Sequence, residues 1–468
     1  MHEQNMKVAI IGGGMTGLAA AWKLEKEIAA GTEVSYDLFE KGEKLGGKIQ
    51  TELVNEFVIE RGPDSFLARK ESMSRLAKDV GMEADLLPNN TGQAYILKDD
   101  QLHPIPAGAV MGVPTEMKPF LESKLISPKG KVRAAGDLFL PNKTSKDEDI
   151  SLGHFFRLRL GDEVVDHLIE PLLSGIYAGN LDKLSLKATF PMYQQMVEKE
   201  GGLIRGMKKS RAKQPKPKTG KAKGVFLTFR KGLGSFVNAI ESHLNSKHVH
   251  KNTDITSIEK EGKRYRIHFK DKESQLYDQV IITTPPHVTA ELLKDFPYFH
   301  YLKEMEATSV ANVALAFKEG AVHNPYEGTG FVVPSKSRYT ITACTWTDKK
   351  WHHSTPEGYT LLRLYVGKPD DSEIVHKSDE EIVKAAMHDL KQIMTITGEP
   401  EFYRVTRWKK AMPQYNVGHS YKIAKIKEDV LRNLPGIHLC GAGFEGVGLP
   451  DCIDQGEAAV KRILKDLH

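Results

Sequence analysis

Short unbroken apolar runs alternate with helically spaced apolar residues in the first part of the chain. Residues 7–11 read KVAII and residues 34–39 read VSYDLF, both typical of strands in a buried parallel sheet. Between them, residues 18–24 read LAAAWKL, which is rich in strong helix formers. The pattern therefore predicts a strand, a helix and a second strand, the order of a βαβ unit.

Three glycines separate the first strand from the helix, and their spacing predicts a dinucleotide site. Gly12, Gly14 and Gly17 stand in the G-x-G-x-x-G register, which gives a tight turn, room for a pyrophosphate and close helix packing. The helix would direct free N–H groups and its positive dipole end at the phosphates. Glu40 ends the second strand and suits a ribose hydroxyl, which argues against NADP. An ordinary βαβ unit with packing glycines is the alternative.

A second glycine stretch follows the second strand. It reads LGGK at residues 45–48 and offers backbone and cationic contacts suited to the same ligand. A strand ending near residue 61 then runs into GPDSF at residues 62–66. Apolar residues at helical spacing predict a helix over residues 67–84. Arg69 and Lys70 lie at the start of this helix, where a cation opposes the dipole, so we expect one of them to face an anion. The alternative is that both are ordinary surface residues.

The central part of the chain carries no second nucleotide pattern. Residues 92–210 predict a small hairpin followed by helical stretches that proline and glycine interrupt. Strands are predicted again at residues 225–229 and, as a meander, across residues 254–282. Residues 300–420 read mostly as strands with one helix, which predicts a large mixed sheet covered by that helix.

The C-terminal stretch has the same order of elements as the N-terminal one: a strand, a glycine-containing turn and a helix. A strand at residues 436–440 breaks into the glycines Gly441 and Gly443, and a helix is predicted from Asp451 onward. A helix N-terminus that follows glycines can direct N–H groups at a bound ligand.

Composition and charge limit the classes of protein that fit. At 468 residues the chain has room for two or three domains, with the composition of an ordinary globular protein. A net charge of +5 is too small for this length to indicate nucleic acid binding. The three cysteines are widely separated, which indicates neither a disulfide framework nor a metal site and fits a reducing cytosol. No apolar run approaches the roughly 20 residues that span a bilayer, and the first strand begins too early to follow a signal peptide.

Residues 207–223 hold basic residues and two prolines but no acid. A flexible, solvated loop explains this composition, and attraction to an anionic membrane surface is the alternative. The interleaved aromatic residues typical of single-stranded nucleic acid binding are lacking. We therefore expect a cytoplasmic protein and leave peripheral contact with a membrane open.

The glycine motif, the acidic strand end, LGGK and ERGPDS together resemble the flavin-dependent amine oxidase superfamily, and the resemblance extends to the C-terminal helix. It implies a non-covalently bound FAD and no metal ion. For Trp408, which the resemblance places near the flavin ring, a position in a hydrophobic core is an equally good interpretation. The residues that the resemblance places on FAD are Gly12, Gly13, Gly14, Met15, Thr16, Gly17, Glu40, Lys41, Gly47, Lys48, Gly62, Pro63, Asp64, Ser65, Ile255, Trp408, Gly443, Val447, Gly448 and Leu449.

Four strings narrow the resemblance to the porphyrinogen oxidases of haem biosynthesis, of the soluble Gram-positive type: GPDSF, IEPLLSGIYAG, MPQY and GFEGVGLPDCIDQG. The resemblance implies oxidation of coproporphyrinogen III, and of protoporphyrinogen IX, by hydride transfer to FAD with molecular oxygen as acceptor. The flavin carries the chemistry, so no protein residue is expected to be catalytic. The rivals are an amine or carotenoid oxidase of the same superfamily, and a flavin-carrying scaffold that serves other haem-pathway enzymes.

A porphyrinogen is a flat apolar ring edged with carboxylates, so its site needs apolar walls and a cation. We consider Ile176, Phe331 and Tyr365 as walls. By resemblance, Lys70 matches a basic position that holds the substrate in this family, with Arg69 as the weaker candidate. The preference between the two porphyrinogens and the oligomeric state stay open.

The expected fold class is α/β, with a Rossmann-like FAD-binding domain built from discontinuous segments, a mixed-sheet substrate domain and a helical insertion. The helical insertion is the part for which contact with a membrane is considered. The predicted boundaries are residues 1–66, 225–290 and 430–468 for the FAD-binding domain, 67–91 and 291–429 for the substrate domain, and 92–210 for the insertion.

Overall fold

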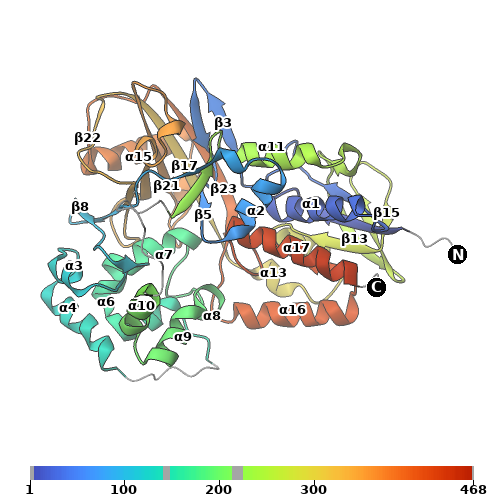
Figure 1. The fold of residues 1–468 in the computed structure, drawn as a ribbon, viewed down its shortest axis with the longest axis horizontal. Helices are drawn as coiled ribbons and strands as arrows, with labels where there is room; N and C mark the ends of the chain where they lie inside the picture. Colours follow the sequence, from blue (N-terminus) through green and yellow to red (C-terminus); the bar gives the residue numbers. More distant parts are fainter. Residues whose placement is uncertain (1–4, 141–147, 213–224, 466–468) are drawn as a thin grey trace. The chain divides into compact units, whose positions relative to one another are not determined.

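The computed structural model describes residues 5–140, 148–212 and 225–465 (Figure 1). It divides into two compact units. The first is built from residues 1–88, 225–306 and 421–468, and the second from residues 89–224 and 307–420. Both glycine stretches and the last helix lie in the first unit.

A five-stranded parallel sheet forms the centre of the first unit, in the order β12-β2-β1-β16-β24. The predicted βαβ unit is confirmed, because α1 (Met15–Ala29) connects its first two strands. The sheet also confirms the Rossmann-like part of the predicted fold. Its strands are β1 (Met6–Ile11), β2 (Val34–Phe39), β12 (Val249–His250), β16 (Gln279–Ile282) and β24 (Ile437–Leu439).

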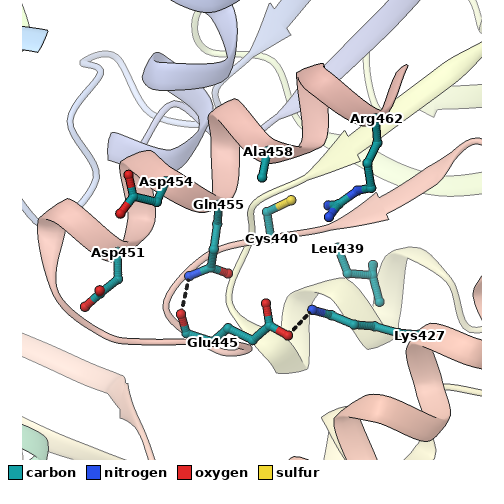
Figure 2. Close-up of a pocket in the computed structure, with 9 residues that line it drawn as sticks. All are labelled: Lys427, Leu439, Cys440, Glu445, Asp451, Asp454, Gln455, Ala458 and Arg462. Atoms are coloured by element: carbon teal, nitrogen blue, oxygen red, sulfur yellow. Dashed lines mark hydrogen bonds and ion pairs between the residues drawn. The ribbon is translucent and has the colours of Figure 1, made fainter. Parts of the chain in front are cut away.

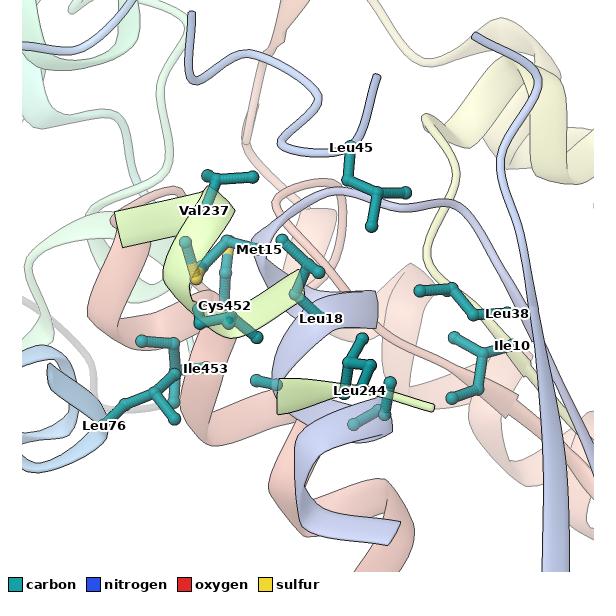
Figure 3. Packing of buried hydrophobic residues seen from close by; sticks show 14 of the residues in the cluster. Ile10, Met15, Leu18, Leu38, Leu45, Leu76, Val237, Leu244, Cys452 and Ile453 are labelled. Carbon is teal, nitrogen blue, oxygen red and sulfur yellow. The ribbon is translucent and has the colours of Figure 1, made fainter. Parts of the chain in front are cut away.

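Alternate side chains of this sheet enter two separate cores. Val8 and Ile10 face a core that includes α1, α2 (Glu71–Asp79), α11 (Leu233–His243) and α17 (Leu449–Lys465), part of which Figure 3 shows. Ala9 and Ile11 face the opposite core. That core includes β13 (Ile255–Glu261), β14 (Arg264–Phe269), β15 (Gln275–Tyr277), α12 (Pro286–Leu292), α13 (His300–Glu304) and α16 (His419–Asn433).

The helix predicted over residues 67–84 is shorter than expected. Phe66–Leu67 forms a strand, β5, which pairs with β11 (Phe226–Phe229), and α2 begins only at Glu71. Residues 68 and 69 form a turn after this pairing, and Lys70, whose backbone is extended, is the residue before the helix. The first unit is completed by β3 (Thr51–Val54), β4 (Phe57–Glu60) and β6 (Leu86–Pro88).

The boundaries of the first unit differ from the predicted ones. Residues 67–88 lie in the first unit, although the sequence pattern assigned them to the substrate domain. They do so because β5 and β6 pair with β11 and because α2 packs in the same core as α17. Residues 291–306 and 421–429 also lie in the first unit, where they contribute to the core under the meander.

The second unit is built around a seven-stranded mixed sheet, which confirms this part of the predicted fold. Its strand order is β23-β17-β21-β20-β19-β7-β8, antiparallel except between β19 and β7. The helix α15 (Asp379–Ile393) packs on one face and begins in a capping box made by Ser378 and Glu381. The strands are β7 (Tyr95–Lys98), β8 (Gln101–Pro104), β17 (Ala307–Lys318), β19 (Gly330–Val332), β20 (Ile341–Trp346), β21 (Tyr359–Val366) and β23 (Phe402–Pro413).

The predicted insertion at residues 92–210 begins with a hairpin that joins this sheet, and helices make up most of the rest. The loop predicted over residues 207–223 is wrong for residues 207–212, which form the last turns of α10. Residues 213–223 lie outside the described residues. None of the helices in the described ranges combines the length and apolar character that crossing a bilayer requires. The helices are α3 (Met117–Glu122), α4 (Pro128–Ala135), α5 (Leu152–Leu160), α6 (Asp162–Val164), α7 (Glu170–Tyr177), α8 (Leu186–Thr189), α9 (Pro191–Glu200) and α10 (Leu203–Ala212).

Candidate functional site

The turn between β1 and α1 needs glycine at two positions for reasons of space. Gly12 has a φ of +104°, and a Cβ there would lie 2.6 Å from Oγ1 of Thr283. A Cβ on Gly17 would lie 1.9 Å from the carbonyl oxygen of Gly12. A Cβ on Gly14, in contrast, would meet nothing within 4 Å. Gly12 and Gly17 are therefore required by the fold, and Gly14 faces open space of the kind that a pyrophosphate occupies.

The N-terminus of α1 is available to an anion. Gly14 is its N-cap, no side chain forms a capping hydrogen bond there, and the first turn holds no acid. Met15 and Thr16 are buried. The groups that this helix end can offer are thus backbone N–H groups and the positive end of the dipole.

The carboxylate of Glu40 holds the glycine turn in place. Its Oε2 accepts the N–H of Gly13 at 2.8 Å, and its Oε1 accepts the N–H of Gly42 at 2.7 Å. From the sequence, the only role predicted for Glu40 is a hydrogen bond with a ribose hydroxyl. A carboxylate can accept about four hydrogen bonds, so a ribose hydroxyl can share these oxygens.

The structure brings the second glycine stretch against the first. The N–H of Gly46 donates to the carbonyl oxygen of Gly13 at 2.8 Å, and a Cβ on Gly47 would lie 3.2 Å from Cα of Gly14. Lys48 follows, and burial lowers the pKa of its amine. Lys41 is separate from this group: its side chain is exposed and its Nζ lies 3.1 Å from the carboxylate of Asp254.

The Gly-Pro turn and the predicted adenine contact lie in the same unit. Gly62, Pro63, Asp64 and Ser65 are all half-buried between β4 and β5, and Ser65 donates to the Asp64 carboxylate at 2.7 Å. Ile255 opens β13, is half-buried and pairs with Phe269.

The first and last helices, α1 and α17, lie side by side (Figure 1). A Cβ on Gly456 would lie 2.3 Å from the carbonyl oxygen of Thr16 and 3.2 Å from the backbone nitrogen of Ala20. Thr16 is also hydrogen-bonded to Cys452, four residues before Gly456. The two helices therefore run in the same direction, and their N-termini lie at the same end of the unit.

The loop before α17 is closely packed. A Cβ on Gly443 would lie 2.3 Å from Cγ of Pro286, and one on Gly448 would lie 2.8 Å from Oδ2 of Asp451. Val447 and Leu449 are half-buried. Because β1, β2, β16 and β24 are parallel, this loop and the glycine turn both follow the carboxyl ends of strands in one sheet, where ligands of such folds bind.

Lys70 is paired with an acid that sequence reasoning did not single out. Its Nζ lies 2.5 and 2.6 Å from the two carboxylate oxygens of Asp451. Arg69, the weaker candidate, is exposed.

In the second unit, two predicted substrate walls lie on opposite faces of the sheet. Phe331 pairs with Cys344 and, like it, belongs to the core under α15. Tyr365 pairs with Ala343, one residue from Cys344, so its side chain points to the other face. Phe331 is only 2% exposed and is a core residue. The structure therefore does not bring Phe331 and Tyr365 together.

Trp408 shares the face of Tyr365. Asn312 lies opposite both Tyr365 and Thr406, and Trp408 is two residues beyond Thr406 on the same strand. Trp408 is half-buried. Ile176 is 38% exposed on α7, a helix that contacts β19 and β20.

A polar pocket of about 250 Å³ opens beside α17 (Figure 2). Gln455 crosses it, accepting from the Gly441 N–H at 3.0 Å and donating to the Glu445 carbonyl oxygen at 2.8 Å. Asp451 contributes to the wall, and its carboxylate points away from the cations of the pocket. The lining residues are Lys427, Leu439, Cys440, Glu445, Asp451, Asp454, Gln455, Ala458 and Arg462.

Two contributors to the site, Thr283 and Asp451, were missed by sequence reasoning. The hydroxyl of Thr283 donates to the carbonyl oxygens of Ile11 and Gly12, both at 3.0 Å. Its position directly after a strand of a parallel sheet was a usable signal, because such positions border the ligand crevice. Asp451 gave no comparable signal, since its partner lies 381 residues away in the sequence.

The fold and the glycine scaffold define a dinucleotide-binding flavoprotein, and comparison with known families agrees. The family of flavin containing amine oxidoreductases matches residues 15–464. This covers nearly the whole chain, and the protein belongs to that family. The open space at Gly14 and the uncapped start of α1 fit the pyrophosphate of a flavin dinucleotide.

Within this family, the chain is similar to curated coproporphyrinogen III oxidases over its full length. It is 50% identical to that of Bacillus subtilis, over 99% of both chains, and 45% identical to that of Staphylococcus aureus, over 98% of this chain and 99% of the relative. A crystal structure of a candidate protoporphyrinogen oxidase from Exiguobacterium sp. 255-15 superposes with a TM-score of 0.88 at 39% identity, over 98% of this chain and 99% of that one. A reduced UDP-galactopyranose mutase, at 17% identity and a TM-score of 0.72, shares the fold.

Proposed function

We propose that this protein is an FAD-dependent coproporphyrinogen III oxidase that serves haem biosynthesis, with molecular oxygen as electron acceptor. The observation that carries the proposal is the likeness to coproporphyrinogen III oxidases at up to 50% identity, which extends over both units. Protoporphyrinogen IX is a second substrate of the same chemistry. When bound, FAD would supply the acceptor for a hydride from a bridge carbon of the porphyrinogen.

The first unit supplies the residues proposed to hold FAD without a covalent bond. The N–H groups of Gly14 and Met15 would donate to the pyrophosphate at the start of α1, next to Gly13, whose own N–H donates to Glu40. Glu40 would accept from a ribose hydroxyl while it keeps the turn closed. The start of α17 would place a second dipole end on the same ligand, because its N-terminus lies at the same end of the unit as that of α1.

The remaining proposed FAD contacts follow the resemblance. They are Lys48, Ile255 and the turn at residues 62–65. For Trp408, the resemblance alone supports the contact. Lys41, which is exposed and paired with Asp254, is the weakest of these assignments.

Lys70 is the residue proposed to hold a carboxylate of the porphyrinogen. Its side chain is 35% exposed, and an ammonium donates strongly to carboxylate oxygens. Tyr365 and Ile176 are proposed to contact the apolar ring. The protein residues therefore bind and orient the substrate and exclude water, and none of them is assigned a proton transfer.

The test is direct. The purified protein should show a flavin spectrum, and mixing it in air with coproporphyrinogen III should raise porphyrin fluorescence far above the spontaneous rate, with peroxide formed. Repeating the assay with protoporphyrinogen IX ranks the two substrates. A yellow protein with no fluorescence rise would overturn the proposed substrate and leave the family assignment intact.

Substitution of Lys70 tests the proposed carboxylate contact. Lys70→Ala should raise KM about tenfold for coproporphyrinogen III, which carries four carboxylates, because one charge-assisted hydrogen bond is lost. The rise should be smaller for protoporphyrinogen IX, which carries two. Arg69→Ala is the matched control, since Arg69 is the exposed neighbouring cation. Equal effects of Lys70→Ala on both substrates would remove Lys70 from this role.

A further inference from the structure

The ion pair between Lys70 and Asp451 leaves one donor of the lysine uncommitted. Both carboxylate oxygens accept from Nζ, at 2.5 and 2.6 Å, so two of the three ammonium hydrogens are engaged. Within the described ranges no further partner of this ammonium is found. The side chains are 35% and 27% exposed, so the pair is within reach of a ligand.

The acid is the fixed member of this pair. A Cβ on Gly446 would lie 2.8 Å from Cβ of Asp451, so the preceding loop packs directly on this side chain, and Gly448 adds a similar contact with Oδ2. Asp451 also lies in the first turn of α17, where the helix dipole stabilises a carboxylate. Lys70, in contrast, carries its charge on a flexible four-carbon stem.

Two further contacts connect α2 to α17, and their role differs from that of the Lys70–Asp451 pair. Ser72 donates to Asp454 at 2.5 Å, and Arg75 donates to Glu457 at 2.8 and 2.9 Å. Asp451, Asp454 and Glu457 are three residues apart and therefore share one face of α17. The two later contacts hold the start of α2 against α17, whereas Asp451 holds only the charged end of Lys70.

We infer that Asp451 is a positioning residue, which fixes the Lys70 ammonium so that its remaining donor is directed at a carboxylate of the substrate. This rests on the proposed porphyrinogen oxidase function. Without Asp451 the lysine would have to be ordered by each substrate molecule. The cost of ordering one long side chain corresponds to roughly a tenfold loss in affinity.

The experiment compares Asp451→Asn with Asp454→Asn, a neighbouring acid on the same helix face. Asp451→Asn should raise KM for coproporphyrinogen III about tenfold, leave kcat within about twofold, and affect protoporphyrinogen IX less. Asp454→Asn should leave the ratio of the two KM values unchanged. A fall in KM would overturn the inference, because it would mean that Asp451 competes with the substrate for Lys70.

A double-variant cycle separates positioning from a structural role. In the Lys70→Met background, Asp451→Asn should add nothing to KM, because there is no ammonium left to position. The same rise in both backgrounds, or loss of bound flavin in Asp451→Asn, would overturn the inference.

Binding of the product, coproporphyrin III, followed by fluorescence quenching, gives a readout that needs no turnover. If the wild type does not oxidise the porphyrinogen, the proposed function fails. The inference about Asp451 is then supported if Asp451→Asn weakens coproporphyrin III binding when Lys70 is present but not in the Lys70→Met background. Any other result overturns it.

Discussion

Gly456 of α17 lies directly against the carbonyl oxygen of Thr16 in α1. A Cβ at Gly456 would come within 2.3 Å of that oxygen, so any larger residue must push the two helices apart. Both helices pack in the core shown in Figure 3, where Met15, Leu18, Cys452 and Ile453 meet. The contact therefore joins the N-terminal glycine turn to the C-terminal segment of the chain.

Gly456→Ala should lower the free energy of unfolding by about 1–3 kcal/mol, the usual cost of overpacking a filled interior. It should also lower the flavin content, because the starts of α1 and α17 move relative to each other. Chemical denaturation and the absorbance ratio of flavin to protein measure both effects. Gly175→Ala is the control, since a Cβ there meets nothing within 4 Å. Equal stability of the two variants would contradict the packing argument.

At Gly14, in contrast to Gly456, a larger residue should affect cofactor binding and not stability. A side chain there meets open space, and the backbone φ of −72° is one that any residue adopts. Gly14→Val should therefore fold, with a near-normal circular dichroism spectrum, but purify without colour because the side chain fills the space proposed for the pyrophosphate. Gly14→Ala should lose less flavin. Flavin retained by the valine variant at the wild-type ratio would remove Gly14 from the proposed site.

The sequence was informative where a rule acts over a short distance. The glycine turn after β1 and the helix of Thr16 and Gly17 could be predicted because strand, turn and helix are neighbours in the chain. The parallel sheet followed from the buried runs of β1 and β2. The same rule predicts the ribose contact of Glu40, whereas its hydrogen bonds with the N–H groups of Gly13 and Gly42 are seen only in the structure.

The failures concern register and distant partners. Phe331 and Tyr365 both read as aromatic residues in strands, but the pairing of Phe331 with Cys344 and of Tyr365 with Ala343 puts them on opposite faces. A shift of one residue reverses a face, and nothing local fixes it. Likewise, α2 starts late because Phe66 pairs with Leu227, a partner from far along the chain.

A buried ion pair in the second unit gives a further prediction about stability. Arg159 donates through Nε to Asp137 at 2.5 Å, and the other oxygen of Asp137 accepts the Ile204 N–H at 2.8 Å. The side chains are 3% and 0% exposed. Asp137→Asn would remove a buried carboxylate that pairs with this guanidinium, so it should lower the free energy of unfolding by about 3 kcal/mol or more.

Urea denaturation of the holoprotein measures this change. Glu122→Gln, which breaks the exposed Lys118–Glu122 pair on α3, is the matched control and should cost less than about 1 kcal/mol. If the two substitutions cost the same, the buried pair contributes no more than a surface one and the argument from burial is wrong.

His438 on β24 should make stability depend on pH. Burial, with a smaller effect of Arg462, lowers its pKa from 6.5 to about 4, and its Nε2 lies 2.8 Å from Oε1 of Gln279. Above pH 6.5 the imidazole is neutral in both states, whereas between pH 6.5 and 4 the unfolded chain binds the proton first. The free energy of unfolding should therefore decrease by up to about 3 kcal/mol as the pH falls from 6.5 to 4.

Thermal unfolding of the wild type and of His438→Gln from pH 7.5 to about 4.5 tests this dependence. Glutamine can still donate to Gln279 but does not titrate, so the wild type should lose Tm more steeply on the acid side and the two curves should approach or cross. Parallel curves over the whole range would show that His438 binds its proton equally well in the folded and unfolded chains, which its burial in the edge strand of the sheet argues against.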